Sequence, residues 1–306
     1  MTTTIPLGWR SGAASDTGPL RARNEDRYWI DDEHGVFLVA DGVGGQAAGE
    51  LAAETAVEAI REYLRTATGT AEERVRRAIT RANNCIYDLA REREALRGMA
   101  CVLTLALVED RHIVIGHVGD SRLYLIWKGA MRKLTSDHSP VGESEDAGEL
   151  TEEEAMQHPR RNEVFRDVGS RGHIAGDDTF IQIRRCSLKP DAAFLICSDG
   201  LTDQLTSAQV REIVQRYDGD PAGVAAELVR AANAAGGKDN TTALLVAGPR
   251  FRGRGDSATA ELPGAVSCAA APWRTLGRLL TGRMAFLLYG LLLAMLVWAA
   301  MHGSRG

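Results

Sequence analysis

The chain has 306 residues, of which 44% are hydrophobic and 25% charged. These shares are ordinary for globular proteins and exclude collagen-like, mucin-like and wholly disordered chains. The formal net charge is −5, and residues 249–283 hold six arginines against Asp256 and Glu261, so the acidic excess lies in residues 1–248. An acidic main domain disfavours nucleic-acid binding, which depends on Lys and Arg side chains that neutralise phosphates.

The first half of the chain shows one apolar run, two helical patterns and then a block of strand patterns. Residues 36–40 predict a short buried strand that ends at Asp41, and a Thr-Gly-Thr break at 68–70 separates the two helices. The two helices are expected at 47–67 and 71–95, and the three strands at 102–108, 113–118 and 122–127.

The second half begins with an irregular region over 137–176, which contains one short helix near 152–157. Strand and helix patterns then return in blocks. Strands are expected at 180–184, 193–197 and 242–246, and helices at 207–217 and 221–235. Because strands and helices do not alternate strictly, we predict an α+β fold in which antiparallel sheets pack together with helices outside. The five scattered cysteines contain no CxxC pair, which disfavours both a disulfide scaffold and a zinc ribbon.

The C-terminal part has a different composition. Residues 249–283 contain many glycines, prolines and arginines and predict a linker, and residues 284–301 are 18 residues without a charged side chain. A helix of that length spans about 27 Å, close to the thickness of a hydrocarbon core. We therefore predict a transmembrane helix over 284–301 and a short tail over 302–306. A buried core helix is the alternative, and it is disfavoured because the run is apolar on all faces.

Basic residues flank this apolar run unequally. The side chains of Arg274, Arg278 and Arg283 precede it, whereas only His302 and Arg305 follow it. By the positive-inside rule, this asymmetry predicts a single-pass protein of the inner (plasma) membrane whose main domain lies in the cytoplasm.

Several of the predicted strands are followed by an aspartate that has a glycine next to it in the sequence. Each Asp-Gly pair alone is more often a turn than a ligand site. Together, however, they place carboxylates at strand ends, where unpaired negative charges would repel one another. A cluster of divalent cations would remove that repulsion, and ligands that are all oxygen atoms favour Mg²⁺ or Mn²⁺. The acidic residues concerned are Glu25, Asp41, Asp120, Asp199 and Asp239.

Five motifs occur in a fixed order, and together they resemble the protein phosphatase 2C family of metal-dependent serine/threonine phosphatases in its bacterial form. The resemblance covers roughly residues 8–248, and the region 137–176 looks like the flap of that group. The motifs are Arg21-x-x-Asn24-Glu25-Asp26, Asp41-Gly42-x-Gly44-Gly45, Gly119-Asp120-Ser121-Arg122, Ser198-Asp199-Gly200-Leu201 and Gly237-x-Asp239-Asn240-Thr241.

The resemblance implies a fold and a set of metal ligands. The fold would be a β-sandwich of two antiparallel sheets flanked by helices on both sides, with 1–248 as the catalytic domain. Two Mn²⁺ or Mg²⁺ ions are implied, with a third at a weaker site. Asp41 would bridge the two ions, and the Gly42 carbonyl would add a ligand. Asp199 and Asp239 would complete the ligands of the first ion, and Glu25 would hold the second ion directly or through water. Asp120 with Asp199 would hold the third ion, and Arg21 would bind the substrate phosphate.

The implied reaction is the hydrolysis of phosphoserine and phosphothreonine in proteins by a water that two metal ions activate. The implied partners are phosphorylated proteins, namely Ser/Thr kinases and their substrates, and the C-terminal helix would bind the membrane. One position departs from the eukaryotic pattern, because Val43 stands where many members carry a histidine proposed as general acid. Two alternatives stay open: a metal-dependent hydrolase of small phosphate esters, and a membrane-anchored phosphoprotein-binding module without activity.

Overall fold

A computed structural model describes residues 8–44, 47–174, 177, 179–253 and 269–270 of the chain. The chain divides into two compact units, residues 1–268 and residues 269–306. The second unit is described only at a two-residue strand, β11 (Ala269–Ala270). The first unit contains every other element and all the candidate site residues, and the fold below is that of the first unit alone.

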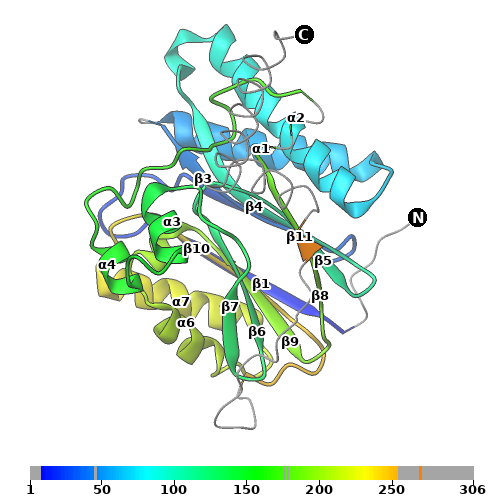
Figure 1. Cartoon of the computed structure of the whole chain (residues 1–306), viewed down its shortest axis with the longest axis vertical. Helices are drawn as coiled ribbons and strands as arrows, with labels where there is room; N and C mark the ends of the chain where they lie inside the picture. Colours follow the sequence, from blue (N-terminus) through cyan, green and yellow to red (C-terminus); the bar gives the residue numbers. More distant parts are fainter. Residues whose placement is uncertain (1–7, 45–46, 175–176, 178, 254–268, 271–306) are drawn as a thin grey trace, which may run out of the picture. The chain divides into compact units, whose positions relative to one another are not determined.

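Two antiparallel sheets form the centre of the first unit (Figure 1). The β9 sheet has the strand order β1-β10-β9-β6-β7, and the β4 sheet contains the order β8-β5-β4-β3-β2. The strands of the β9 sheet are β1 (Arg10–Asp16), β10 (Thr241–Ala247), β9 (Ala192–Cys197), β6 (Arg122–Trp127) and β7 (Ala130–Lys133). Those of the β4 sheet are β8 (Gln182–Ser187), β5 (His112–Val118), β4 (Ala100–Glu109), β3 (Val36–Val43) and β2 (Asp26–Asp31).

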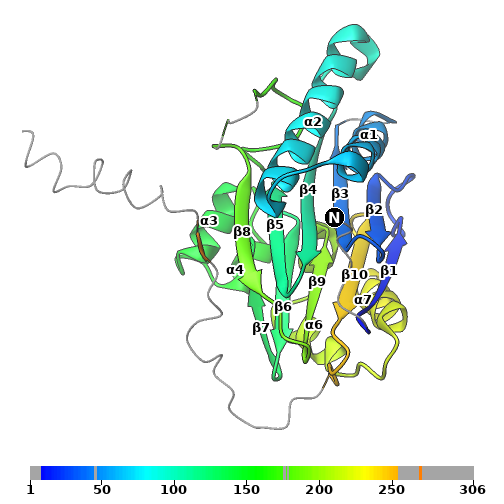
Figure 2. The same ribbon diagram turned by 90° about the vertical axis from the view of Figure 1, so that its right-hand side faces the viewer.

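Helices cover the outer face of each sheet, as Figure 2 shows in side view. The long helices α1 (Ala47–Thr66) and α2 (Ala71–Glu92) pack on the β4 sheet, and α6 (Ser207–Val214) and α7 (Pro221–Ala235) pack on the β9 sheet. Shorter helices complete the unit: η1 (Glu94–Leu96), α3 (Pro140–Asp146), α4 (Glu152–Met156) and α5 (Asp199–Thr202). The predicted sandwich of two antiparallel sheets with helices on both sides is therefore confirmed.

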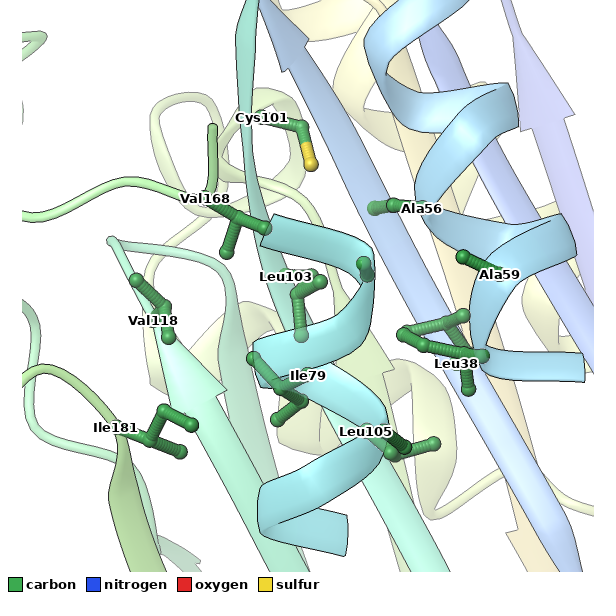
Figure 3. Close-up of a cluster of buried hydrophobic side chains, with 14 of the residues drawn as sticks. Leu38, Ala56, Ala59, Ile79, Cys101, Leu103, Leu105, Val118, Val168 and Ile181 are labelled. Atoms are coloured by element: carbon green, nitrogen blue, oxygen red, sulfur yellow. The ribbon is translucent and has the colours of Figure 1, made fainter. Parts of the chain in front are cut away.

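The core consists of three apolar layers, because the central strands are buried on both faces. On β3, Phe37 and Val39 lie between the sheets, whereas Leu38 points to the helices, as the period of two along a strand requires. Figure 3 shows the helix-side layer, in which Leu38, Leu103, Leu105 and Ile79 are labelled. This double burial explains why the strands appear in the sequence as nearly continuous apolar runs.

Gly116 on β5 lies directly beneath side chains of α2. A Cβ atom at this position would collide with the side chains of Val75 and Ile79. We expect Gly116→Ala to lower the free energy of unfolding by about 1–3 kcal/mol, since extra atoms in a packed core force neighbours to move. Urea unfolding of Gly116→Ala, Val75→Ala and the double variant measures this effect. The double variant should lose less stability than the sum of the two single changes, and simple additivity would contradict the explanation.

Most predicted elements are present, with shifted ends. Strand β3 continues through Asp41 to Val43, and β8 begins at Gln182, two residues after the predicted start at 180. Five elements of the first unit lie outside the predicted ranges: β1, β2, β7, α3 and α5. The three strands among them are edge strands, β1 and β7 in the β9 sheet and β2 in the β4 sheet. Their side chains are mostly half-buried or exposed, so their sequences show little alternation of apolar and polar residues.

The predicted membrane location is corrected. Among the residues that the structure describes, no helix is both long enough and apolar enough to cross a bilayer. The two longest described helices, α1 and α2, have 20 and 22 residues, but each has one buried face and one charged face. The predicted span 284–301 lies outside the described residues. The expectation of a single-pass inner-membrane protein is therefore withdrawn, and the division into 1–248, 249–283, 284–301 and 302–306 stays a prediction.

Candidate active site

The acidic residues singled out in the sequence lie at one end of the two sheets. Asp41 is on β3, directly opposite Asp26 of β2 in the antiparallel register. Asp199 is the first residue of α5, just after β9, and Asp239 stands two residues before β10, the neighbour of β9. Asp120 follows β5 in the turn that leads to β6. The ends of strands from both sheets thus carry these carboxylates.

A buried hydrogen-bond network joins the two sheets beside Asp41. Asp26 of the β4 sheet accepts hydrogen bonds from Ser198 Oγ and Thr242 Oγ1, each 2.7 Å from its Oδ2. The Thr242 N–H donates in turn to Ser198 Oγ at 2.9 Å. This network holds the end of β9 against β2. Asp199 follows Ser198 in the chain, so it lies close enough to Asp41 for the two carboxylates to repel each other.

Burial and mutual repulsion change the acidity of these carboxyl groups. Burial, together with the charges of Asp26 and Asp199, raises the pKa of Asp41 well above its ordinary value. Burial and the charge of Asp120 do the same to the pKa of Asp199. Burial also raises the pKa of Asp120 to about 7, with a contribution from Asp137, and that of Asp26 to about 6. So many buried carboxylates destabilise one another unless positive charge is added.

Two oxygen atoms lie beside Gly49 of α1: the carbonyl oxygen of Gly42 on β3 and a carboxylate oxygen of Glu25, just before β2. A Cβ atom on Gly49 would lie 2.9 Å from the Gly42 carbonyl oxygen and 3.0 Å from Glu25 Oε2. The Gly42 N–H donates to the Glu25 carbonyl oxygen at 3.3 Å, which keeps the two loops together. Burial raises the pKa of Glu25, against the opposing charge of Arg21. Glycine at position 49 therefore leaves space beside two oxygen atoms that sequence reasoning had assigned to metal binding.

Arg21 lies over the same site. Its Nη2 atom is 2.5 Å from Asp239 Oδ2, and its Nε donates to the Lys238 carbonyl oxygen at 3.4 Å. Among the described residues, no three His, Cys, Asp or Glu side chains are arranged closely enough to hold a metal ion as they stand. In this arrangement Arg21 supplies the positive charge at Asp239.

Sequence reasoning missed the role of Asn240 in building this site. Its Nδ2 donates to the carbonyl oxygens of Thr17 and Arg23, both at 2.8 Å, and its Oδ1 accepts the Glu25 N–H at 2.8 Å. One amide side chain next to Asp239 thus fixes the loop that carries Arg21 and Glu25. The motif Gly237-x-Asp239-Asn240-Thr241 contained the signal, but the distant partners of Asn240 could not be inferred from it.

A narrow pocket connects the carboxylates to the predicted flap. Asp120, Asp199 and Asp203 line it, together with Ser139 and Glu152 of the flap. Sequence reasoning also missed Asp203, although it follows Asp199 by four residues, one helical turn. Its carboxylate is 2.7 Å from Arg161 Nε of the flap. The flap contains two short helices, α3 and α4, rather than the single helix predicted near 152–157.

The donor set matches a hard divalent cation. All the converging groups are carboxylate or carbonyl oxygens, which Mg²⁺ and Mn²⁺ prefer. Asp199 Oδ1 is buried and has no hydrogen-bond partner among the described residues. A cation would satisfy this oxygen atom and offset the repulsion that raises the pKa of Asp41 and Asp199.

Comparison with known proteins agrees with the motif order. The family model described as protein phosphatase 2C matches residues 21–231, more than half of the chain. The chain belongs to the protein phosphatase 2C family. It is 37% identical over 242 residues to the serine/threonine phosphatase Stp of Listeria innocua, covering 76% of this chain and 93% of that protein. It is 36% identical to the protein phosphatase PhpP of Streptococcus pneumoniae over 240 residues, covering 76% of this chain and 94% of that protein.

Solved structures of the family share this fold. The Mycobacterium tuberculosis serine/threonine phosphatase PstP/Ppp has a TM-score of 0.70 and 30% identity, covering 79% of this chain and 99% of that one. A second structure, the catalytic domain of serine threonine protein phosphatase PstP, contains two manganese ions and has a TM-score of 0.68 and 28% identity, covering 78% of this chain and 97% of that one. In the motif Asp41-Gly42-x-Gly44-Gly45 of the present chain, Val43 is 41% exposed, and its side chain has no proton to donate.

Proposed function

We propose that this chain hydrolyses phosphoserine and phosphothreonine esters in proteins, in a reaction that requires two Mn²⁺ or Mg²⁺ ions and admits a third. The acidic side chains that strands of both sheets bring together, with one buried carboxylate oxygen of Asp199 unpartnered among the described residues, carry this proposal. The names of the relatives Stp and PhpP and the manganese ions of the PstP structure support it.

In this proposal the acidic side chains and the Gly42 carbonyl bind metal ions, and Arg21 binds the substrate phosphate. Divalent cations, when bound, supply what the carboxylates cannot: they make water nucleophilic at neutral pH and offset the charge of the phosphoryl oxygens. Arg21 binds the substrate phosphate, because its planar fork suits two phosphate oxygens. Metal at Asp239 would release Arg21 from the ion pair that it makes in this structure. The proposed metal-binding groups are Asp41, the Gly42 carbonyl, Asp199, Asp239, Glu25 and, for the third ion, Asp120 with Asp199.

The substrate class follows from the chemistry. Phosphoserine and phosphothreonine in proteins are products of protein kinases, so we propose that the enzyme opposes a bacterial Ser/Thr kinase and acts on that kinase or its targets. The site geometry binds the phosphate and not a peptide sequence, so substrate choice depends on residues around the site.

The proposal is tested by hydrolysis of a phosphothreonine peptide by the full chain, in Mn²⁺ and in EDTA. We expect release of inorganic phosphate with Mn²⁺ and none with EDTA, and restored activity when Mn²⁺ is added back. Free nucleotides and small phosphate esters, assayed in parallel, should be poorer substrates. Activity on small esters but not on phosphopeptides would contradict the proposed substrate class, and phosphopeptide hydrolysis that persists in EDTA would contradict the metal requirement.

A further inference from the structure

The loop that carries Glu25 holds three arginines whose side chains have different surroundings. Arg21 contacts Asp239, and Arg27 donates to Glu50 Oε1 at 2.5 Å. The third, Arg23, is the most exposed of them, with 64% of its side chain accessible to solvent. Its guanidinium group is thus in contact with water, next to the proposed phosphate-binding residue.

The backbone of Arg23 is fixed while its side chain extends outward. Asn240 Nδ2 donates to the Arg23 carbonyl oxygen, and Asn240 Oδ1 accepts the Glu25 N–H, both at 2.8 Å. The charge of Arg23 is felt at Glu25, because it opposes the rise in the pKa of that carboxyl that burial causes. Arg23 therefore presents its positive charge beside the site from an anchored position.

The contact between Arg23 and Glu50 is weak. Arg23 Nη1 lies 3.6 Å from Glu50 Oε2, and Arg27 already pairs with the other oxygen of Glu50. Within the described part of the chain, Arg23 has no other ion pair. An exposed pair of this length contributes little to stability, so an incoming anion can replace Glu50 as the partner of Arg23.

We propose that Arg23 binds an anionic side chain of the phosphoprotein substrate, a carboxylate or a second phosphate, about two residues from the phosphorylated residue. Arg23 stands two residues after Arg21, the proposed phosphate-binding residue, so their Cα atoms lie within roughly 7 Å of each other. Two residues of an extended substrate chain cover the same distance. A guanidinium group pairs with either kind of anion. This inference rests on the proposed phosphatase activity and specifies which phosphoproteins the site prefers.

Matched peptides test the role of Arg23. Three phosphothreonine peptides differ only two residues before and after the phosphothreonine, where they carry Glu, Gln or phosphoserine. With Mn²⁺, the parent enzyme should show a higher kcat/KM on the Glu and phosphoserine peptides than on the Gln peptide. Arg23→Gln should lower kcat/KM on the two acidic peptides about threefold to fivefold, mainly through KM, and leave the Gln peptide within about twofold. Arg23→Lys should restore part of the loss, because it keeps the charge.

The control variant is Arg61→Gln. Arg61 is an exposed arginine of α1 whose Nη1 lies 3.9 Å from Glu58, so the variant removes the same charge away from the site. It should leave the peptide preference unchanged. The difference between the parent and Arg23→Gln on the acidic peptides should also shrink as salt is added, because the contact is exposed.

Three results would overturn the inference. If Arg23→Gln lowered activity equally on all three peptides, Arg23 would support the loop and not bind the substrate. If no peptide distinguished Arg23→Gln from the parent, Arg23 would have no role in binding. If the parent hydrolysed no phosphopeptide with Mn²⁺, the proposed function itself would fail and the inference with it. If the parent preferred the phosphoserine peptide to the Gln peptide but did not prefer the Glu peptide, the inference would hold for a second phosphate and not for a carboxylate.

Discussion

Asp199→Asn should reduce phosphopeptide hydrolysis in saturating Mn²⁺ by at least about 100-fold, because it removes a charged oxygen from the proposed metal site. The same change should stabilise the metal-free protein. Burial and the charge of Asp120 raise the pKa of Asp199, which means that the carboxylate is unfavourable where it lies. Neutral asparagine has nearly the same shape and avoids this cost. In EDTA we expect the Tm of the variant to exceed that of the parent by a few degrees.

The opposite changes in activity and stability separate a metal ligand from a structural residue. Steady-state kinetics and thermal unfolding in EDTA and in Mn²⁺ measure both, and Mn²⁺ should raise the Tm of the parent more than that of the variant. Asp88→Asn, an exposed position on α2, is the control and should change neither quantity. Full activity in the Asp199→Asn variant would exclude the proposed ligand role. A lower Tm in EDTA would show that Asp199 stabilises the fold through contacts of its own.

The sequence predicted the central strands and the end of the sheets at which the acidic residues lie. These strands are buried on both faces, so their apolar runs are continuous, and the position of Asp41 and Asp199 after such runs places them at strand ends. The edge strands β1 and β7 were not predicted because they are short or polar and only half-buried. Their pairing depends on neighbours that are distant in the chain, and no local pattern encodes that.

The residues that build the site were harder to predict than those expected to bind metal. Asp26 is bonded by Ser198 and Thr242, which are 172 and 216 residues away in the sequence. Asn240 likewise fixes a loop that lies more than 200 residues earlier. A motif indicates which residue types the chemistry requires, whereas these supporting contacts form only when the two sheets have packed. The motif Gly119-Asp120-Ser121-Arg122 also contained Arg122, to which no role could be given before its partners were known.

Arg122 is the centre of a buried ion network, and its removal should destabilise the fold strongly. Its Nε and Nη2 atoms donate to Asp137 Oδ2 at 2.9 and 2.7 Å, and Nη2 also lies 2.6 Å from Glu145 Oε2. Only 12% of the Arg122 side chain and 3% of the Asp137 side chain are exposed. Burial alone would raise the pKa of Asp137, yet the charges of Arg122 and Lys133 hold it below its ordinary value.

Arg122→Met should therefore lower the free energy of unfolding by about 3–5 kcal/mol, because it leaves Asp137 buried with only the longer contact to Lys133. Adding Asp137→Asn should recover part of the loss, since the uncompensated charge is then removed. Arg160→Met is the matched control: it breaks an Arg–Glu pair with Glu163 whose side chains are 59% and 52% exposed, and it should leave the free energy of unfolding nearly unchanged. Urea unfolding of the four proteins in EDTA measures these differences.

The free energy of unfolding of the parent and of Arg122→Met, measured as a function of pH, tests independently whether Arg122 acts on Asp137 through its charge. In the parent the pKa of Asp137 lies below its unfolded value, so its contribution to stability is present above about pH 4 and is lost as the pH falls through the folded pKa. In Arg122→Met the main compensating charge is gone, so burial should raise the pKa of Asp137 above the unfolded value. Stability should then increase as the pH falls from 7 towards 5, relative to the parent. A constant difference between parent and variant over this range would mean that Arg122 acts through packing of its side chain and not through its charge.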